Sequence, residues 1–276
     1  MIVDTHIHLI SSDRERFPLN IYPHIGREWI DSAPDADSFI ARMEAAGVDK
    51  AILVQPHGAY GTDNSYICFA ASKYKSLVPV AIIDPFDGHR VNTLSDLAQK
   101  NVVGLRLFSI PTPEDSWLGA KEISQIWAEA KAHNIVIEVC ALPEELKAID
   151  RCAEQYSEQT IVVDHCCFVP LHEASHPSTQ LLLGLSKYPN IVLKVTSVVI
   201  DNWVSGGRET QSLFPALAEK FGPDRLVWGS DYAQTSRPYD QLVDFGIEAM
   251  SSLGSQSSGP EGLNALRIWS VMKAVQ

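Results

Sequence analysis

The 276-residue sequence has few cysteines, no paired-cysteine motif and no long apolar run. Its five cysteines are odd in number and show no CxxC spacing, which argues against a disulfide framework and favours reduced thiols in a cytoplasm. No apolar run approaches the length that spans a bilayer, and no charged, apolar leader precedes the first β-branched segment. We therefore expect a cytoplasmic protein without a membrane-spanning segment.

Positive charge is also scarce, because 22 Lys and Arg residues face 34 Asp and Glu residues, for a net charge of −12. Such a surface would repel phosphate backbones, and no stripe of basic residues is present, so we expect no nucleic-acid partner. The composition, 45% hydrophobic and 20% charged, is typical of a globular protein with a large core. The expected partner is a small-molecule substrate, and the sequence does not indicate an oligomeric state.

Eight short β-branched runs alternate with segments of helical period. This order predicts parallel strands joined by helical crossovers, and eight units in about 250 residues match a (β/α)₈ TIM barrel of the α/β class. The alternative is a doubly wound open sheet, which we disfavour because no glycine-rich phosphate loop follows the first run. We expect one domain over residues 1–276. The runs cover residues 3–10, 51–55, 78–83, 102–108, 135–139, 161–165, 191–196 and 226–231.

Two segments fall outside this alternation. Residues 10–35 form a long first βα loop whose aromatic content favours an ordered lid, with Tyr22 and Trp29 as its candidates. Residues 251–262 form a Ser/Gly-rich connection to the segment GLNALRIWSVMKAV. The apolar spacing of that segment predicts an extra C-terminal helix, which we expect on the outside of the barrel.

The opening stretch VDTHIHLI places two imidazoles one residue apart. Alternate residues of a strand point to the same face, so His6 and His8 share a face, and by the same count Asp4 shares it with them. A metal-ligand or catalytic pair is one interpretation of this spacing. Two interior histidines that are hydrogen-bonded inside the barrel are the other.

The barrel brings further polar residues to the same place, because active sites of this fold lie at the C-terminal ends of the strands. Closure makes the last strand the neighbour of the first, so Asp231 is expected beside His6 and His8. Lys194 is expected to fill an inner layer, paired with an acid such as Asp4; contact with the substrate is the other interpretation. The other polar residues at or just beyond strand ends are Gln55, His57, Tyr60, Arg106, Glu138, Asp164, His165, Thr196, Ser197 and Ser230.

The motifs VDTHIHL, VVDHCC and VWGSDYAQ, in this order, resemble the amidohydrolase superfamily. The closer similarity is to its amidohydrolase-2 branch, which includes 2-pyrone-4,6-dicarboxylate lactonase and sugar lactonases; the stretches RFPLN, ILVQPHGAYGTDN, GLRLF and NALRIW fit that branch. The resemblance covers essentially the whole chain. It implies a (β/α)₈ barrel and a hydrolase that opens a small lactone ring.

The resemblance also implies roles for individual residues. His6, His8 and Asp231 match the HxH pair and the aspartate of the last strand, and His165 matches the histidine after the sixth strand. Arg106 matches an arginine that contacts a substrate carboxylate. No lysine ends the fourth strand, where binuclear members carry a carboxylated one.

The implied chemistry takes one of two forms, and both use Asp231 as the general base. With a divalent ion such as Zn or Mn, His6, His8 and Asp231 form an open three-ligand site, to which Glu138 or His165 is a possible addition. Without an ion, Asp231 alone activates water, while the histidines, including His165, orient the carbonyl and stabilise the oxyanion.

Substrate recognition leaves further alternatives open. Arg106 suits a substrate carboxylate because its guanidinium is a planar fork, although an ion pair with Glu138 on the adjacent strand is the other interpretation. Gln55, His57 and Tyr60 are expected at the substrate pocket. The alternative activity is a non-oxidative decarboxylase of a small carboxylic acid, which the same superfamily also contains.

Overall fold

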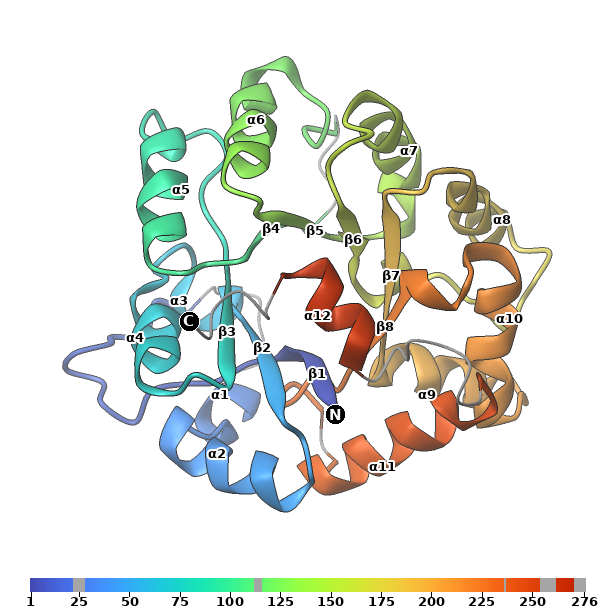
Figure 1. Ribbon diagram of the computed structural model, residues 1–276, viewed down its shortest axis with the longest axis horizontal. Helices are drawn as coiled ribbons and strands as arrows, with labels where there is room; N and C mark the ends of the chain where they lie inside the picture. Colours follow the sequence, from blue (N-terminus) through green and yellow to red (C-terminus); the bar gives the residue numbers. More distant parts are fainter. Residues whose placement is uncertain (22–27, 112–115, 236, 254–261, 271–276) are drawn as a thin grey trace.

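The sheet is a barrel of eight parallel strands in chain order, seen end-on in Figure 1. The computed structural model describes residues 1–21, 28–111, 116–235, 237–253 and 262–270. The strands are β1 (Val3–Ile7), β2 (Lys50–Val54), β3 (Leu77–Ala81), β4 (Gly104–Ser109), β5 (Val136–Ala141), β6 (Ile161–Val163), β7 (Ile191–Thr196) and β8 (Leu226–Gly229).

The barrel closes between its last and first strands. Ile7 forms a parallel bridge with Tyr232, and the Asp231 amide donates to the carbonyl of His6 at 2.9 Å. On the same seam, the Thr5 hydroxyl donates to the carbonyl of Trp228 at 2.7 Å. These contacts confirm the predicted barrel and exclude the doubly wound open sheet.

Helices surround the barrel on its outer face (Figure 1). Among the described helices, none combines the length and the apolar character that a bilayer crossing requires. The helices are α1 (Glu28–Ser32), α2 (Ala36–Ala45), α3 (His57–Tyr60), α4 (Ser65–Lys73), α5 (Arg90–Gln99), α6 (Ser124–Ala132), α7 (Leu146–Gln155), α8 (Pro177–Gly184), α9 (Ser197–Ser205), α10 (Leu213–Phe221), α11 (Tyr239–Met250) and α12 (Asn264–Ile268).

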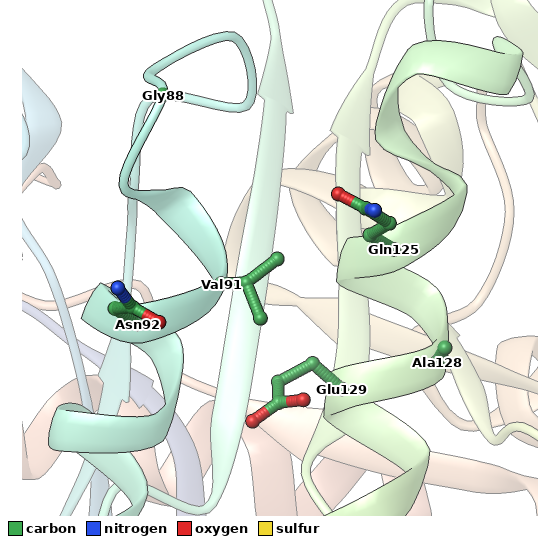
Figure 2. A pocket seen from close by; sticks show the side chains of 6 residues that line it. All are labelled: Gly88, Val91, Asn92, Gln125, Ala128 and Glu129. Carbon is green, nitrogen blue, oxygen red and sulfur yellow. The ribbon is translucent and has the colours of Figure 1, made fainter.

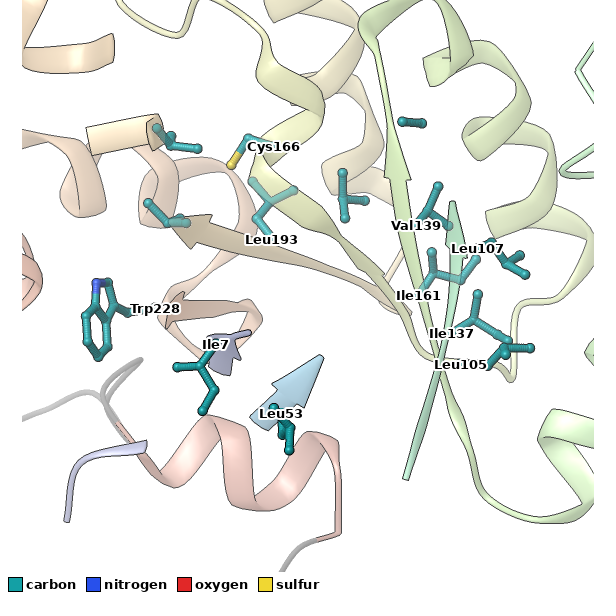
Figure 3. Close-up of a cluster of buried hydrophobic side chains, with 14 of the residues drawn as sticks. Ile7, Leu53, Leu105, Leu107, Ile137, Val139, Ile161, Cys166, Leu193 and Trp228 are labelled. Carbon is teal, nitrogen blue, oxygen red and sulfur yellow. The ribbon is translucent and has the colours of Figure 1, made fainter. Parts of the chain in front are cut away.

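The main hydrophobic core lies between the barrel and the helices. Strand residues alternate between the two faces, and one set of aliphatic side chains packs outward against the helices. This arrangement leaves the other set to line the interior, where the polar residues of the strands also lie. Figure 3 labels outward residues of this core, including Ile7, Leu53, Leu105, Ile137 and Leu193.

The floor of the barrel is closed by the C-terminal helix. A second buried cluster joins inward valines near the N-terminal ends of the strands, such as Val136 and Val192, to Leu266 and Trp269. Figure 1 shows α12 across the centre of the barrel. The expectation that this helix packs outside the barrel was wrong, because its apolar residues cover the valine layer that the open end would expose to water.

The first strand is irregular, and this irregularity moves Asp4 off the face of the histidines. Its register with β2 shifts between Asp4 and Ile7. The Asp4 carboxylate accepts hydrogen bonds from the Ser230 amide at 2.8 Å and from the Tyr239 hydroxyl of α11 at 3.1 Å. The predicted common face of Asp4, His6 and His8 was therefore wrong, since the shift breaks the alternation that the prediction assumed.

Candidate active site

Two histidines and one aspartate meet where β1 adjoins the end of β8. His6 Nε2 lies 3.2 Å from His8 Nε2. The Oδ1 atom of Asp231 lies 3.6 Å from His6 Nε2 and 3.7 Å from His8 Nε2. The ring of His165 lies 4.9 Å from the ring of His6. Residues from both ends of the chain thus share one cluster at the C-terminal end of the barrel.

Asp231 is a buried carboxylate, and one of its oxygens forms no hydrogen bond with the described residues. Only 8% of the residue is exposed, and burial raises the pKa of its carboxyl group to about 7. Its Oδ1 atom has no hydrogen-bond partner among the described residues. Its φ angle of +58° is uncommon for a non-glycine residue. Such a carboxylate is able to accept a proton near neutral pH.

His8 is a neutral imidazole whose proton is directed away from the cluster. Its Nδ1 atom lies 2.9 Å from the carbonyl oxygen of Val54, an acceptor, so Nδ1 carries the proton. Burial lowers the pKa of His8 to about 3, which keeps the ring neutral. The Nε2 atom of His8 therefore presents a lone pair toward His6 and Asp231.

His6 has the opposite tautomer because of Lys194. The Lys194 Nζ atom lies 3.3 Å from His6 Nδ1. Burial disfavours the ammonium group, but Asp164 and Glu138 outweigh burial and raise the pKa of Lys194. An ammonium group only donates, so Nδ1 of His6 accepts and the proton of the neutral ring lies on Nε2. Burial and the charge of Lys194 both lower the pKa of His6, which keeps the ring neutral.

His165 lies in a left-handed turn, Asp164–Phe168, directly after β6. Its φ angle is +51°, and Cys166 and Cys167 have similar values. Each such residue costs about 1–3 kcal/mol, so packing must hold the turn in place. Arg106 Nη2 donates to His165 Nε2 at 3.2 Å, which leaves the proton on Nδ1, 2.8 Å from the hydroxyl oxygen of Thr196.

A layer of four buried charges, here called the charge layer, lies beside these histidines: Arg106, Glu138, Asp164 and Lys194. Arg106 Nε donates to Asp164 Oδ2 at 2.7 Å. Lys194 Nζ lies 2.6 Å from Glu138 Oε2 and 3.0 Å from Asp164 Oδ1. Although burial opposes ionisation, Lys194 and Arg106 lower the pKa of Asp164 to about 2. Two cations and two carboxylates thus neutralise one another inside the barrel.

The charge layer differs from the two ion pairs that the sequence suggested. Arg106 pairs with Asp164 rather than with Glu138, although Arg106 and Glu138 are partners in the register of β4 and β5. Lys194 pairs with Glu138 and Asp164 rather than with Asp4. Asp4 is excluded because the register shift turns it toward α11.

The remaining predicted residues lie at the second strand and its loop. The Gln55 amide nitrogen donates to the carbonyls of Gly61 and Asp63 and so braces that loop. The Tyr60 hydroxyl accepts from the Ser11 amide at 2.9 Å. The ring of His57 lies 4.6 Å from the ring of Phe108 on β4.

The predicted lid is described only in part. Trp29 of α1 lies 6.1 Å from the ring of His8. Tyr22, the other candidate, lies outside the described residues.

Sequence reasoning missed Phe168, whose ring stacks on His165 at 4.8 Å with an interplanar angle of 24°. Phe168 is 36% exposed, although it is a large apolar residue. The sequence also did not indicate that Thr196 would hold the His165 ring. No local signal predicts these contacts, because they depend on the left-handed turn.

The spacing of His6 Nε2, His8 Nε2 and Asp231 Oδ1 suits a divalent cation, but the protonation of His6 does not. Each edge of this triangle is between 3.2 and 3.7 Å, and bonds of about 2.1 Å would reach all three atoms. A metal-binding imidazole usually donates its second N–H to an acceptor, as His8 does. His6 instead accepts from Lys194 and carries its proton on Nε2, so only two of the three atoms present lone pairs.

Other groups with metal-ligand spacing occur among the described residues, namely His6–His165–Asp231, Cys140–Asp164–His165 and His6–Glu138–Asp164. Each contains a histidine with one ring nitrogen that faces a cationic donor, Lys194 or Arg106. We therefore derive no chemical step through a metal ion.

A groove on the outer wall is distinct from this site. It has a volume of about 380 Å³ and lies between α5 and α6, with Val91 on one side and Gln125 on the other (Figure 2). Its single carboxylate, Glu129, is engaged by Ser95 and His133. The described residues that line it include no histidine, cysteine or basic residue, so the strand ends remain the candidate site.

Gly229 of β8 provides the space that His6 occupies. A Cβ atom at this position would lie 2.7 Å from the Cβ of His6 and 3.0 Å from its backbone nitrogen. We expect Gly229→Ala to cost about 1–3 kcal/mol of stability by overpacking and to lower kcat by about 100-fold by displacing His6. Gly88→Ala is the control, because a Cβ there meets nothing within 4 Å. Equal activity of the two variants would show that the position of His6 is unimportant.

Comparisons with known proteins identify the family and the relatives that this chain resembles. A family model described as amidohydrolase matches residues 3–251. The chain is 23% identical to an L-fucono-1,5-lactonase of Burkholderia ambifaria over 222 residues, which cover 77% of this chain and 73% of that protein. It is 26% identical to a 4-sulfomuconolactone hydrolase of Rhizobium radiobacter over 241 residues, 83% of this chain and 74% of that protein.

Solved structures share the fold along nearly the whole chain. A probable 2-pyrone-4,6-dicarboxylic acid hydrolase of Acinetobacter baumannii superposes with a TM-score of 0.73 at 21% identity, over 98% of this chain and 99% of that one. A Burkholderia multivorans amidohydrolase with bound zinc gives 0.77 at 18% identity, over 98% and 99%. A 5-carboxyvanillate decarboxylase of Sphingomonas paucimobilis gives 0.68 at 15% identity, over 98% of each chain.

Proposed function

Because this chain belongs to the amidohydrolase family, we propose that it is a hydrolase that opens the ring of a small carboxylated lactone. One observation carries the proposal: Oδ1 of Asp231, which has no hydrogen-bond partner among the described residues, lies within 3.7 Å of two neutral histidines. The names of the two curated relatives, both enzymes that hydrolyse lactones, support this reaction class.

The reaction begins with a water molecule beside Asp231. The carboxylate takes a proton from the water, and the water oxygen forms a bond to the ester carbonyl carbon. The Nε2–H of His6, which faces the lone pair of His8 Nε2 at 3.2 Å in the free protein, donates instead to the carbonyl oxygen as that oxygen becomes negative. The bond between the carbonyl carbon and the ring oxygen then breaks, and the ring oxygen takes the proton from Asp231. The product is a ring-opened acid that has gained one water.

Arg106 is the proposed anchor for the substrate carboxylate. Its guanidinium has five N–H donors, of which one is bound to Asp164 and one to His165. Among the described residues no hydrogen-bond partner is seen for the remaining donors, and the planar fork suits two parallel hydrogen bonds to a second carboxylate. The exposed ring of Phe168 and the His57–Phe108 pair are proposed to flank the lactone ring, with Gln55 and Tyr60 shaping the adjacent loop.

The variant Arg106→Lys tests the anchor while keeping the charge beside Asp164. Lysine lacks the fork, so we expect KM for a carboxylated lactone to rise about tenfold or more, with a smaller change in kcat. The comparison substrate is a lactone with the same ring but no carboxylate, for which KM should change little. An equal rise for both substrates would contradict a carboxylate anchor at Arg106.

We further propose that the reaction does not require a metal ion, although related structures with bound zinc exist. The support is the proton on His6 Nε2, which occupies the position of a ligand lone pair. Protein prepared without chelator should contain substoichiometric zinc and manganese by elemental analysis, and prolonged chelation should leave kcat/KM unchanged. Loss of activity on chelation with recovery on adding Zn²⁺ would contradict this part of the proposal.

The product identifies the reaction and separates it from the alternative of decarboxylation. Hydrolysis of a lactone yields a ring-opened acid, heavier than the substrate by one water, with no carbon dioxide. Mass spectrometry of the product and a carbon dioxide assay therefore test the proposal together. Release of carbon dioxide would favour the alternative, to which the decarboxylase fold match lends support.

We also propose that the protein works in the cytoplasm as a single domain over residues 1–276. All five cysteines are free, and four of them are buried. Free thiols are typical of a reducing compartment. A fusion to a fluorescent protein, viewed in the native cell, tests the location.

A further inference from the structure

We infer that Lys194 is a positioning residue that selects the tautomer of His6. Seated by Glu138 and Trp269, it keeps the His6 proton on Nε2. This makes His6 a hydrogen-bond donor to the substrate and withholds the lone pair that a metal ion would need. The role of His6 as a donor to the substrate rests on the proposed function, whereas the tautomer itself is a property of the free protein.

The His6 Nδ1 atom faces two neighbours of opposite character. Lys194 Nζ, a pure donor, lies 3.3 Å away, while Asp164 Oδ1, a pure acceptor, lies 4.0 Å away. A bond from Lys194 places the ring proton on Nε2, and a bond to Asp164 would place it on Nδ1. The shorter contact is with Lys194, so the ammonium group favours the tautomer with the proton on Nε2, where the lone pair of His8 Nε2 accepts at 3.2 Å.

The Lys194 ammonium group is fixed by Glu138 of β5 and by Trp269, which follows α12. Glu138 accepts from Lys194 with Oε2 at 2.6 Å and from the Trp269 indole N–H with Oε1 at 2.9 Å. The Trp269 ring also lies 5.4 Å from Lys194 Nζ, within range of a cation–π contact. Trp269 therefore fixes both the carboxylate and the ammonium that the carboxylate binds, and it links the C-terminal segment to His6.

Every member of this chain of contacts is buried. His6, Glu138 and Lys194 have no exposed surface, and Trp269 is 1% exposed. Water therefore does not compete for these hydrogen bonds, and a lost partner leaves a polar atom unsatisfied. Among the described residues Trp269 forms hydrogen-bond and ring contacts with Glu138 and Lys194 but not with His6 or Asp231, so the geometry predicts that a change at Trp269 reaches the site through Lys194.

The tautomer is measured directly by NMR of protein labelled with ¹⁵N-histidine, without substrate. The spectrum of His6→Gln assigns the His6 signals among the nine histidines. We expect the parent to show His6 protonated on Nε2. Lys194→Met removes the donor, so His6 should turn to Asp164 and show its proton on Nδ1. A parent with the proton on Nδ1, or a Lys194→Met variant that keeps it on Nε2, would overturn the inference.

Trp269→Phe tests the hydrogen bond from Trp269 to Glu138 and has a matched control. It removes the indole N–H and keeps an aromatic ring. Trp127→Phe also removes one buried indole hydrogen bond, here to the Leu118 carbonyl at 3.2 Å on the outer wall. Only Trp269→Phe should shift the His6 signals and lower kcat, by about fivefold at unchanged KM. Equal effects of the two variants would reduce Trp269 to a structural residue.

Zinc binding gives a second readout that does not need turnover. Calorimetric titration should show that Lys194→Met binds Zn²⁺ at least about tenfold more tightly than the parent, because a second partner of a histidine commonly changes metal affinity to this extent. The variant Lys194→Met/Glu138→Gln serves the same purpose if the single variant does not fold. Equal zinc affinity in parent and variant would contradict the inference. If the parent protein hydrolyses no lactone, only the proposed function is contradicted.

Discussion

The Asp231→Asn variant is expected to lose kcat by about three orders of magnitude, within the range that a general base contributes. Asparagine has the same shape, so its side chain still fits beside His6 and His8. It is unable to take a proton from water, and its amide group replaces the oxygen that has no partner in the described structure. A substrate analogue should therefore bind the variant about as well as it binds the parent.

The fold of Asp231→Asn should remain intact, and its melting temperature should not fall. Burial already raises the pKa of the Asp231 carboxyl group, which shows that the site disfavours the charge that asparagine lacks. Asp96→Asn, at an exposed position of α5, is the control for the loss of one carboxylate. A variant that keeps more than about a tenth of the parent activity would place the base elsewhere, and His165 would then be the next residue to substitute.

The barrel and the meeting of distant residues followed from patterns that sequence carries well. Short β-branched runs located all eight strands, because such runs between segments of helical period are a local property of the sequence. Closure then brought Asp231 to His6 and His8, since the last strand of a barrel borders the first. The predicted fold therefore placed Asp231 beside His6 and His8, although no local sequence motif contains all three residues.

The partners inside that neighbourhood were not predictable in the same way. The register shift between Asp4 and Ile7 turned Asp4 toward α11. Lys194 therefore forms ion pairs with Glu138 and Asp164 instead of with Asp4. A shift of one residue reverses the face of a side chain, and hydropathy does not reveal such a shift. The position of the C-terminal helix was also predicted wrongly. The apolar face of a helix has the same sequence pattern whether it packs on a layer of valines at the end of the barrel or on the outer wall.

The second large effect is expected at the charge layer, where Lys194→Met should lower stability by about 3 kcal/mol or more. The substitution removes one cation and leaves Glu138 and Asp164 to share Arg106, and breaking a buried ion pair from one side commonly costs 3–5 kcal/mol. In thermal unfolding this corresponds to a decrease in Tm of roughly 6–12 °C for a chain of this size.

Lys194→Met/Glu138→Gln separates the balance of charge from the positioning of His6. The double variant leaves Arg106 paired with Asp164, and the glutamine oxygen still accepts from the Trp269 indole. Replacing both members of a buried ion pair is often nearly neutral, so we expect stability to return to within about 1 kcal/mol of the parent. Activity should not return, because the donor to His6 Nδ1 is still missing. Recovery of both would mean that Lys194 serves only to neutralise Glu138, while recovery of stability alone would show that His6 needs the ammonium group itself.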